Sequence, residues 1–160
     1  MLCLVVVKDL DIDSQICPYI PFGKKRKDSS YKLSDEFSLF YLKFMELNRT
    51  PAKGAWQKLS ATPVYASWSG LAFENLCIKH IAAIEKKLGI AAIYTESSSW
   101  RSPGNHAVGA KIDLLIDRRD QCINLCEMKI YSSEVAIDKT LAAELRQKET
   151  IFREQTKTKK

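Results

Sequence analysis

Two neighbouring apolar segments of this chain carry charged residues near their centres, and this feature constrains the fold most. Asp113 lies within Lys111–Ile116, and Glu127 and Lys129 lie within Leu125–Lys129. Both segments have the composition of buried strands, and a buried carboxylate without a partner costs several kcal/mol. The sequence therefore predicts two consecutive strands whose ionisable side chains have a structural or chemical role.

The turn around Arg118–Asp120 decides how these strands pair. One antiparallel register places Asp113 directly opposite Glu127, with their Cβ atoms about 4.5–5.5 Å apart. A three- or five-residue loop, or a bulge, gives this register, whereas a two- or four-residue loop sends Glu127 to the opposite face. Glu127 and Lys129 share a face because they are two residues apart. We expect Asp113, Glu127 and Lys129 on one face.

Two carboxylates this close repel each other unless a cation or a shared proton lies between them. Mg²⁺ or Mn²⁺ suits such oxygen ligands, so Asp113 and Glu127 are candidate metal ligands. Lys129 would then steady the attacking water or the charge that develops on a phosphate. The alternative is a partly exposed strand face on which Lys129 simply neutralises Glu127.

The elements around this pair alternate in type. The sequence predicts, in order, a helix from Leu71 to Leu88 capped by Ser69 and ended by Gly89, strands at 90–95, 110–117 and 121–130 with a loop at 96–109, and a final helix capped by Asp138. We therefore expect an α/β fold of the α+β type with a mixed sheet.

The N-terminal third reads as a separate unit. Met1–Val7 is a strand candidate, and short strands at 19–22 and 31–33 bracket a basic turn, with a helix capped by Ser34 behind them. Residues 49–66 lack periodicity and read as a linker with a short helical turn around Trp56. The expected units are 1–48, the linker 49–66, and 67–160.

The charge of +6 lies at the two ends of the chain. Residues 1–60 and 137–160 each carry a balance of +3, while the middle of the chain is neutral. Two basic flanks can hold a polyanion without specifying it. The alternative is that these lysines only keep the surface soluble.

Asp113, thirteen further residues, and then Glu127-Met128-Lys129 resemble the motif of the PD-(D/E)XK nuclease superfamily, which has the restriction-endonuclease-like fold. The resemblance implies a core ordered helix, strand, strand, strand, helix. Glu74 matches a helical glutamate that supports the metal site in many members.

The wider sequence resembles a nuclease-like domain found C-terminal to archaeal-type AAA+ ATPase modules. The matching segments are Trp68–Glu74, Trp100-Arg101, Gly109–Asp113 and Cys126–Lys129, with Ile20–Lys27 and Tyr31–Phe37 resembling the wing and trailing helix of a preceding winged-helix segment. The resemblance implies an AAA+ module upstream in the parent polypeptide and a truncated C-terminus, because the family fold continues with another strand. The sequence lacks a Gly-x4-Gly-Lys-Ser/Thr phosphate loop, so we expect no ATP site in this chain.

The resulting hypothesis is a Mg²⁺- or Mn²⁺-dependent DNA phosphodiester hydrolase. Its catalytic residues would be Glu74, Asp113, Glu127 and Lys129, with Asp113 and Glu127 holding the metal; Lys24, Lys25, Arg26, Lys27 and Arg101 would contact DNA. The alternative is a non-catalytic module that retains the nuclease fold and binds DNA or regulates the ATPase. A third possibility is an inert fragment.

The expected location is the cytoplasm. No apolar run reaches the about 18–20 residues that a transmembrane helix requires, so we expect no membrane contact. The five cysteines include no Cys-x-x-Cys pair, which favours a reducing compartment.

Overall fold

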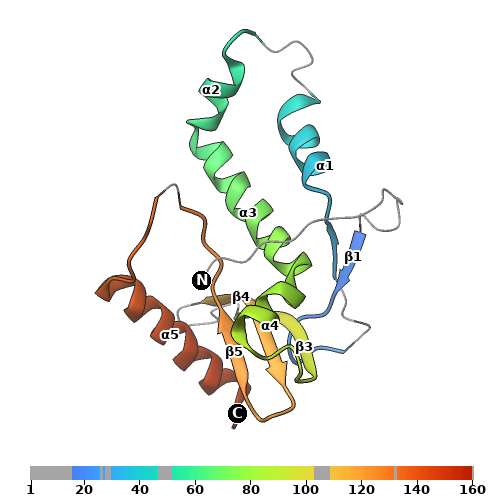
Figure 1. The fold of residues 1–160 in the computed structure, drawn as a ribbon, viewed down its shortest axis with the longest axis vertical. Coiled ribbons are helices and arrows are strands. Elements are labelled where there is room, and N and C mark those ends of the chain that lie inside the picture. Colours follow the sequence, from blue (N-terminus) through green and yellow to red (C-terminus); the bar gives the residue numbers. More distant parts are fainter. Residues whose placement is uncertain are drawn as a thin grey trace.

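The computed structural model describes residues 16–25, 27, 30–46, 52–102, 109–131 and 133–159, with only the backbone described at 16–19 and 30–32. The strand expected at Met1–Val7 lies outside the described residues, as does Arg26. The described part has α+β structure, with a two-stranded sheet, a three-stranded sheet and helices (Figure 1). Both sheets are antiparallel rather than mixed.

The N-terminal unit pairs β1 (Ile16–Tyr19) with β2 (Ser30–Leu33) and continues into α1 (Glu36–Phe40). A single turn of π-helix, η3 (Tyr41–Met45), extends α1. The prediction that Ser34 is the N-cap of this helix is wrong by one residue. Asp35 caps α1, because its carboxylate accepts a 2.6 Å hydrogen bond from the backbone N–H of Ser38.

Helix α2 (Ala55–Ser60) confirms the short helical turn expected around Trp56. Helix α3 (Pro63–Lys79) begins well before the expected Leu71 and passes through the expected linker boundary. The start is set by Pro63 at the first helical position and by Thr62, whose hydroxyl accepts from the backbone N–H of Tyr65. Ser69 is therefore inside the helix and is not its cap.

The predicted end of this helical region at Gly89 is confirmed. After a break at His80, helix α4 (Ile81–Leu88) ends at Gly89, which has a φ of 73°. The N–H of Ile90 donates to the carbonyl of Glu85, and the Ile90 side chain is buried. This is the arrangement of a left-handed glycine followed by a hydrophobic partner.

The main sheet contains β3 (Thr95–Ser102), β4 (Ala110–Arg118) and β5 (Ile123–Cys126), in that spatial order. The strand expected at 90–95 is wrong, and β3 instead occupies much of the segment expected as a loop. Its serine-rich run has little intrinsic strand preference, so pairing along β4 determines its conformation. The strand expected at 121–130 is shorter, because β5 ends at Cys126.

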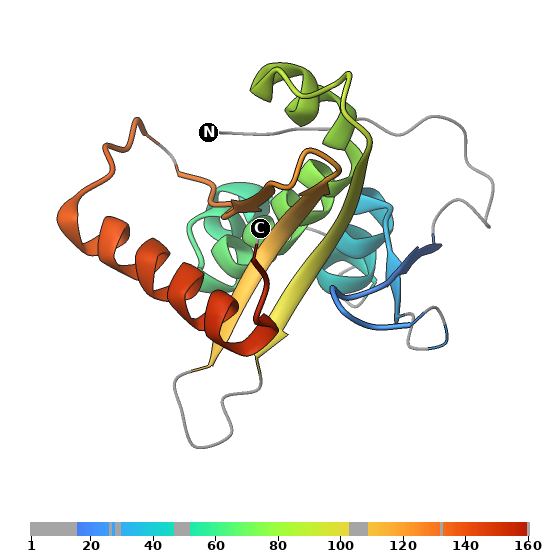
Figure 2. The same ribbon diagram turned by 90° about the horizontal axis from the view of Figure 1, so that it is seen from below.

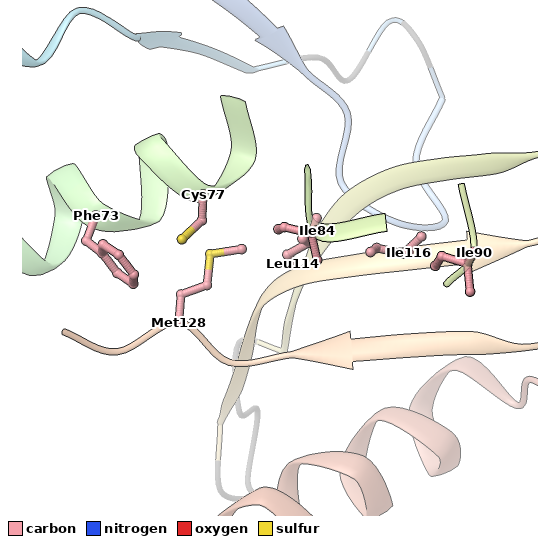
Figure 3. Close-up of a cluster of buried hydrophobic side chains, with 7 residues drawn as sticks. All are labelled: Phe73, Cys77, Ile84, Ile90, Leu114, Ile116 and Met128. Carbon is pink, nitrogen blue, oxygen red and sulfur yellow. The ribbon is translucent and has the colours of Figure 1, made fainter. Parts of the chain in front are cut away.

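Helix α5 (Lys139–Thr156) covers one face of the sheet, and α3 and α4 lie against the other (Figures 2 and 3). The cap predicted at Asp138 is confirmed by its 2.7 Å hydrogen bond from the N–H of Leu141. The first core, shown in Figure 3, fills the α3/α4 side and contains Phe73, Cys77, Ile84, Ile90, Leu114, Ile116 and Met128. The second core fills the α5 side and contains Trp100, Ala110, Ile112, Leu115 and Phe152.

None of the helices in the described ranges combines the length and apolarity needed to cross a bilayer.

Candidate functional site

The predicted register between β4 and β5 is confirmed. Leu114 faces Cys126 and Asp117 faces Ile123, and β5 ends at Cys126, one residue before Glu127. The N–H of Arg118 donates to the carbonyl of Cys122 at 2.9 Å, which closes a three-residue loop. This is one of the odd loop lengths that the register requires.

A β-bulge in β4 changes which face Asp113 occupies. Ser98 faces Leu115 while Trp100 faces Ile112, so a single residue of β3 lies opposite both Asp113 and Leu114. The extra residue shifts the alternation of side chains along β4. Ile112 and Leu115 consequently both belong to the second core on the α5 side.

Asp113 lies on the α3 side of the sheet. Only 7 % of this residue is exposed, and its Oδ2 accepts a 3.0 Å hydrogen bond from the backbone N–H of Met128. Its Oδ1 lies 2.8 Å from the Nζ of Lys111, which in turn lies 2.6 Å from Oε2 of Glu74 on α3. Glu74, Lys111 and Asp113 therefore form an ion cluster, which we call the α3-side triad.

Glu127 lies on the α5 side. Both of its carboxylate oxygens are 2.7 Å from the Nζ of Lys148 on α5. The residues flanking Glu127 agree with this orientation, because Cys126 and Met128 pack in the first core on the other side. The prediction that Asp113 and Glu127 share one face is therefore wrong, and the bulge is the reason.

Lys129 has a looser environment than expected. Its Nζ lies 4.0 Å from Glu127 and 3.7 Å from Glu144, and its side chain is 38 % exposed. Lys148 is thus the closer counter-charge of Glu127. Glu127 and Lys129 do line a common cavity of about 420 Å³, beside the start of α5.

The electrostatics of the α3-side triad favour a charged lysine. Burial opposes the charge of Lys111, but hydrogen bonds and Coulombic attraction to Asp113 and Glu74 outweigh that cost. The pKa of Lys111 therefore lies above its ordinary value of 10.5. The triad places one ammonium group between two carboxylates, so the lysine offsets one of their two negative charges.

The residues expected to contact DNA lie at the surface where they are described. Lys24, Lys25 and Lys27 are exposed in the turn between β1 and β2. Arg101 is exposed on β3, directly across from Lys111 of β4. The turn is held against the main sheet, because the N–H of Phe22 donates to the carbonyl of Ser99 at 2.8 Å.

Sequence reasoning missed the two lysines that pair with the carboxylates, Lys111 and Lys148. Lys111 is two residues before Asp113, and the strand period of two already places it on the same face. Lys148 is three residues after Leu145 and four before the buried Phe152, so helical spacing turns it toward the sheet. Both signals are present in the sequence.

The described residues contain no group of three or more His, Cys, Asp or Glu side chains that could hold a metal ion. The Mg²⁺ or Mn²⁺ site and the catalytic roles of Glu74, Asp113, Glu127 and Lys129 stay predictions. Comparisons with models of known protein families, with curated proteins and with solved structures found no match.

Proposed function

We propose that this chain is a nucleic-acid-binding module that does not cleave its ligand. The observation that carries the proposal is the anchored basic turn. Lys24, Lys25 and Lys27 are exposed, and the preceding Phe22 ties the turn to β3 by a backbone hydrogen bond and to α5 by ring contact with Phe152. Lysines that follow an anchored residue lose less conformational freedom when they contact phosphates.

The separation of the two carboxylates supports binding without cleavage. Metal-assisted hydrolysis needs carboxylates that converge on one cation. Asp113 and Glu127 point to opposite sides of the sheet, and each has a lysine within 2.8 Å. A cation that used both side chains would have to displace two ammonium groups and reorient one carboxylate.

The proposal uses the resemblance to a nuclease-like domain for the fold and its context, and not for cleavage. A domain with the restriction-endonuclease-like core, preceded by part of a winged helix, would serve as the DNA-binding or regulatory part of a cytoplasmic AAA+ ATPase. In that arrangement the ATPase module is upstream in the parent polypeptide, and DNA is the partner of both.

A second candidate is Mg²⁺- or Mn²⁺-dependent phosphodiester hydrolysis, and one observation favours it. Glu74 of α3 meets Asp113 of β4 around a single cation, the ammonium of Lys111. This is the meeting of helix and strand that the family resemblance implies. A divalent ion could use these two carboxylates if Lys111 moved away.

The test combines binding and cleavage measurements on the full chain. Anisotropy of a labelled DNA duplex, titrated at several salt concentrations, should show binding that weakens as salt rises. Replacing Lys24, Lys25, Arg26 and Lys27 together with Gln should reduce the log–log salt slope by up to about 3–4. No binding by the unmodified chain, or an unchanged slope in the variant, would refute the proposal.

The same samples distinguish the second candidate. Supercoiled, linear and branched DNA are incubated with Mg²⁺ or Mn²⁺, with Asp113→Ala as the control. The binding proposal predicts intact DNA in every lane. Cutting by the unmodified chain that Asp113→Ala abolishes would establish the hydrolase instead.

A further inference from the structure

Three aromatic rings join the basic turn to the C-terminal end of α5. The ring centroids of Phe22 and Phe152 are 5.5 Å apart, and those of Phe152 and Trp100 are 5.2 Å apart. Phe152 is 2 % exposed and Trp100 is 7 % exposed. Two parts of the chain that are far apart in sequence therefore meet here.

Each of these two parts continues into lysines. Residues 20–27 contain four basic side chains and no acidic one, and residues 155–160 contain three lysines and no acidic side chain. Lys24 and Lys27 are exposed on the first part, and Lys157 and Lys159 are exposed on the second. The segments that carry these lysines are thus joined at the contact between Phe22 and Phe152.

The backbone at the end of α5 keeps the second group in a defined direction. Lys157 adopts a left-handed conformation with a φ of 52°, and its N–H donates to the carbonyl of Arg153 at 3.0 Å. The hydroxyl of Thr156 donates to the carbonyl of Phe152 at 2.7 Å. Lys157 therefore follows the last residue of α5, five residues after Phe152, which contacts Phe22.

We propose that Lys24, Lys27, Lys157 and Lys159 form one composite surface for the sugar–phosphate backbone of duplex DNA. The inference rests on the proposed function and extends it, because it assigns a second contact region to the C-terminal end. A duplex presents phosphates over a wide surface, so two lysine groups on a common rigid support can engage it together.

The burial of the aromatic residues favours a duplex over a single strand. Binding of single strands depends on exposed rings that stack on unpaired bases. Here Phe152 and Trp100 are buried, and Phe22 packs against Phe152, so these rings serve as structural support. The exposed groups of this surface are ammonium groups, which interact with phosphates and not with base faces.

Three matched double variants of the full chain test the inference. Lys24→Gln/Lys27→Gln removes two charges from the turn, and Lys157→Gln/Lys159→Gln removes two from the C-terminal end. Lys86→Gln/Lys87→Gln is the control, since these exposed lysines lie in the last turn of α4 and their loss changes the net charge equally. Circular dichroism spectra are used to check that all three variants are folded.

The readout is the salt dependence of binding to the labelled duplex. Each of the first two variants should lose up to about 1.8 from the log–log slope, since each phosphate contact contributes about 0.9. Between 50 and 200 mM salt, the factor by which the binding constant falls should therefore be roughly tenfold smaller for the variant than for the unmodified chain. The control should change the slope by clearly less, because its lysines lie outside the surface.

The outcomes separate the inference from the proposed function. If the unmodified chain does not bind the duplex, the proposed function fails. If it binds, and Lys157→Gln/Lys159→Gln behaves like the control, only the composite surface is refuted. Preferential binding to single strands would also overturn the inference. The same holds for binding to vesicles of anionic phosphatidylserine in place of the duplex.

Discussion

Replacing Lys111 with Met removes the charge that lies between Glu74 and Asp113. Both carboxylates have an oxygen within 2.8 Å of the lysine nitrogen, so their oxygens are at most about twice that distance apart. Without the ammonium group the two carboxylates repel each other. Asp113 stays buried and keeps its hydrogen bond from the backbone N–H of Met128.

The expected loss of stability lies between two limits. Breaking a fully buried ion pair costs about 3–5 kcal/mol, while an exposed pair contributes about 0–1 kcal/mol. Asp113 is 7 % exposed, but the side chain of Lys111 is 42 % exposed, so water screens part of the interaction. We expect Lys111→Met to lower the free energy of unfolding by about 2 kcal/mol, or the melting temperature by about 4–8 °C.

Thermal and urea unfolding followed by circular dichroism measure this change. The matched control is Lys87→Met, which removes an exposed lysine at the end of α4. A double-mutant cycle with Asp113→Asn isolates the coupling between Lys111 and Asp113. If Lys111→Met is as stable as the control variant, the α3-side triad contributes nothing and the reasoning is wrong.

The pH dependence of the same pair gives a second readout. The pKa of Lys111 in the folded chain is raised above 10.5 by Asp113 and Glu74, despite burial. Such a group contributes stability that is fully present below the unfolded pKa and is lost as pH rises through the folded one. The stability difference between the unmodified chain and Lys111→Met should therefore be constant from about pH 7 to pH 9 and shrink above about pH 10.5.

Three further perturbations follow from the described contacts. Lys148→Met should cost about 1–3 kcal/mol and speed hydrogen exchange in α5, because Glu127 loses its close counter-charge; exchange equal to that of the unmodified chain would contradict this. Phe152→Ala should cost about 3–5 kcal/mol in urea unfolding, and a cost well under that range would show that this core is loosely packed. The pKa of His80 is lowered mainly by burial, so stability should fall as pH drops below 6.5, and His80→Gln should remove this dependence in melting curves.

Local signals predicted the elements that depend on local chemistry. Gly89 ends α4 and Asp138 caps α5, because both effects involve backbone groups within one turn. The register of β4 and β5 was one of two that the sequence left open, and the three-residue loop after Arg118 selects it. The strand β3 was missed because its serine-rich sequence becomes extended only by pairing with β4.

The candidate site was predicted in its residues but not in its geometry. The local sequence around Asp113 does not predict the bulge, because a bulge depends on how two strands pair. This bulge lies opposite Ser99 of β3. One extra residue there is enough to send Asp113 toward α3 while Glu127 faces α5. A pairing rule based on loop length alone therefore gives the correct register and the wrong face.

Divalent cations give opposite expectations for binding and for hydrolysis. In the binding proposal, the ammonium of Lys111 already occupies the position between Glu74 and Asp113, so Mg²⁺ or Mn²⁺ should leave the unfolding midpoint unchanged relative to NaCl of equal ionic strength. Lys111→Met frees both carboxylates, and added Mg²⁺ should then recover part of the lost stability. In the hydrolase candidate, the metal binds the native chain itself and stabilises it by about 2.7 kcal/mol at a hundredfold excess over its dissociation constant. A rise in the midpoint of the unmodified chain that Asp113→Ala abolishes would refute the expectation that Lys111 keeps divalent cations out, because a cation could displace Lys111 only if the carboxylates bind it more tightly than the ammonium. It would favour the hydrolase candidate, which the cleavage assay then decides.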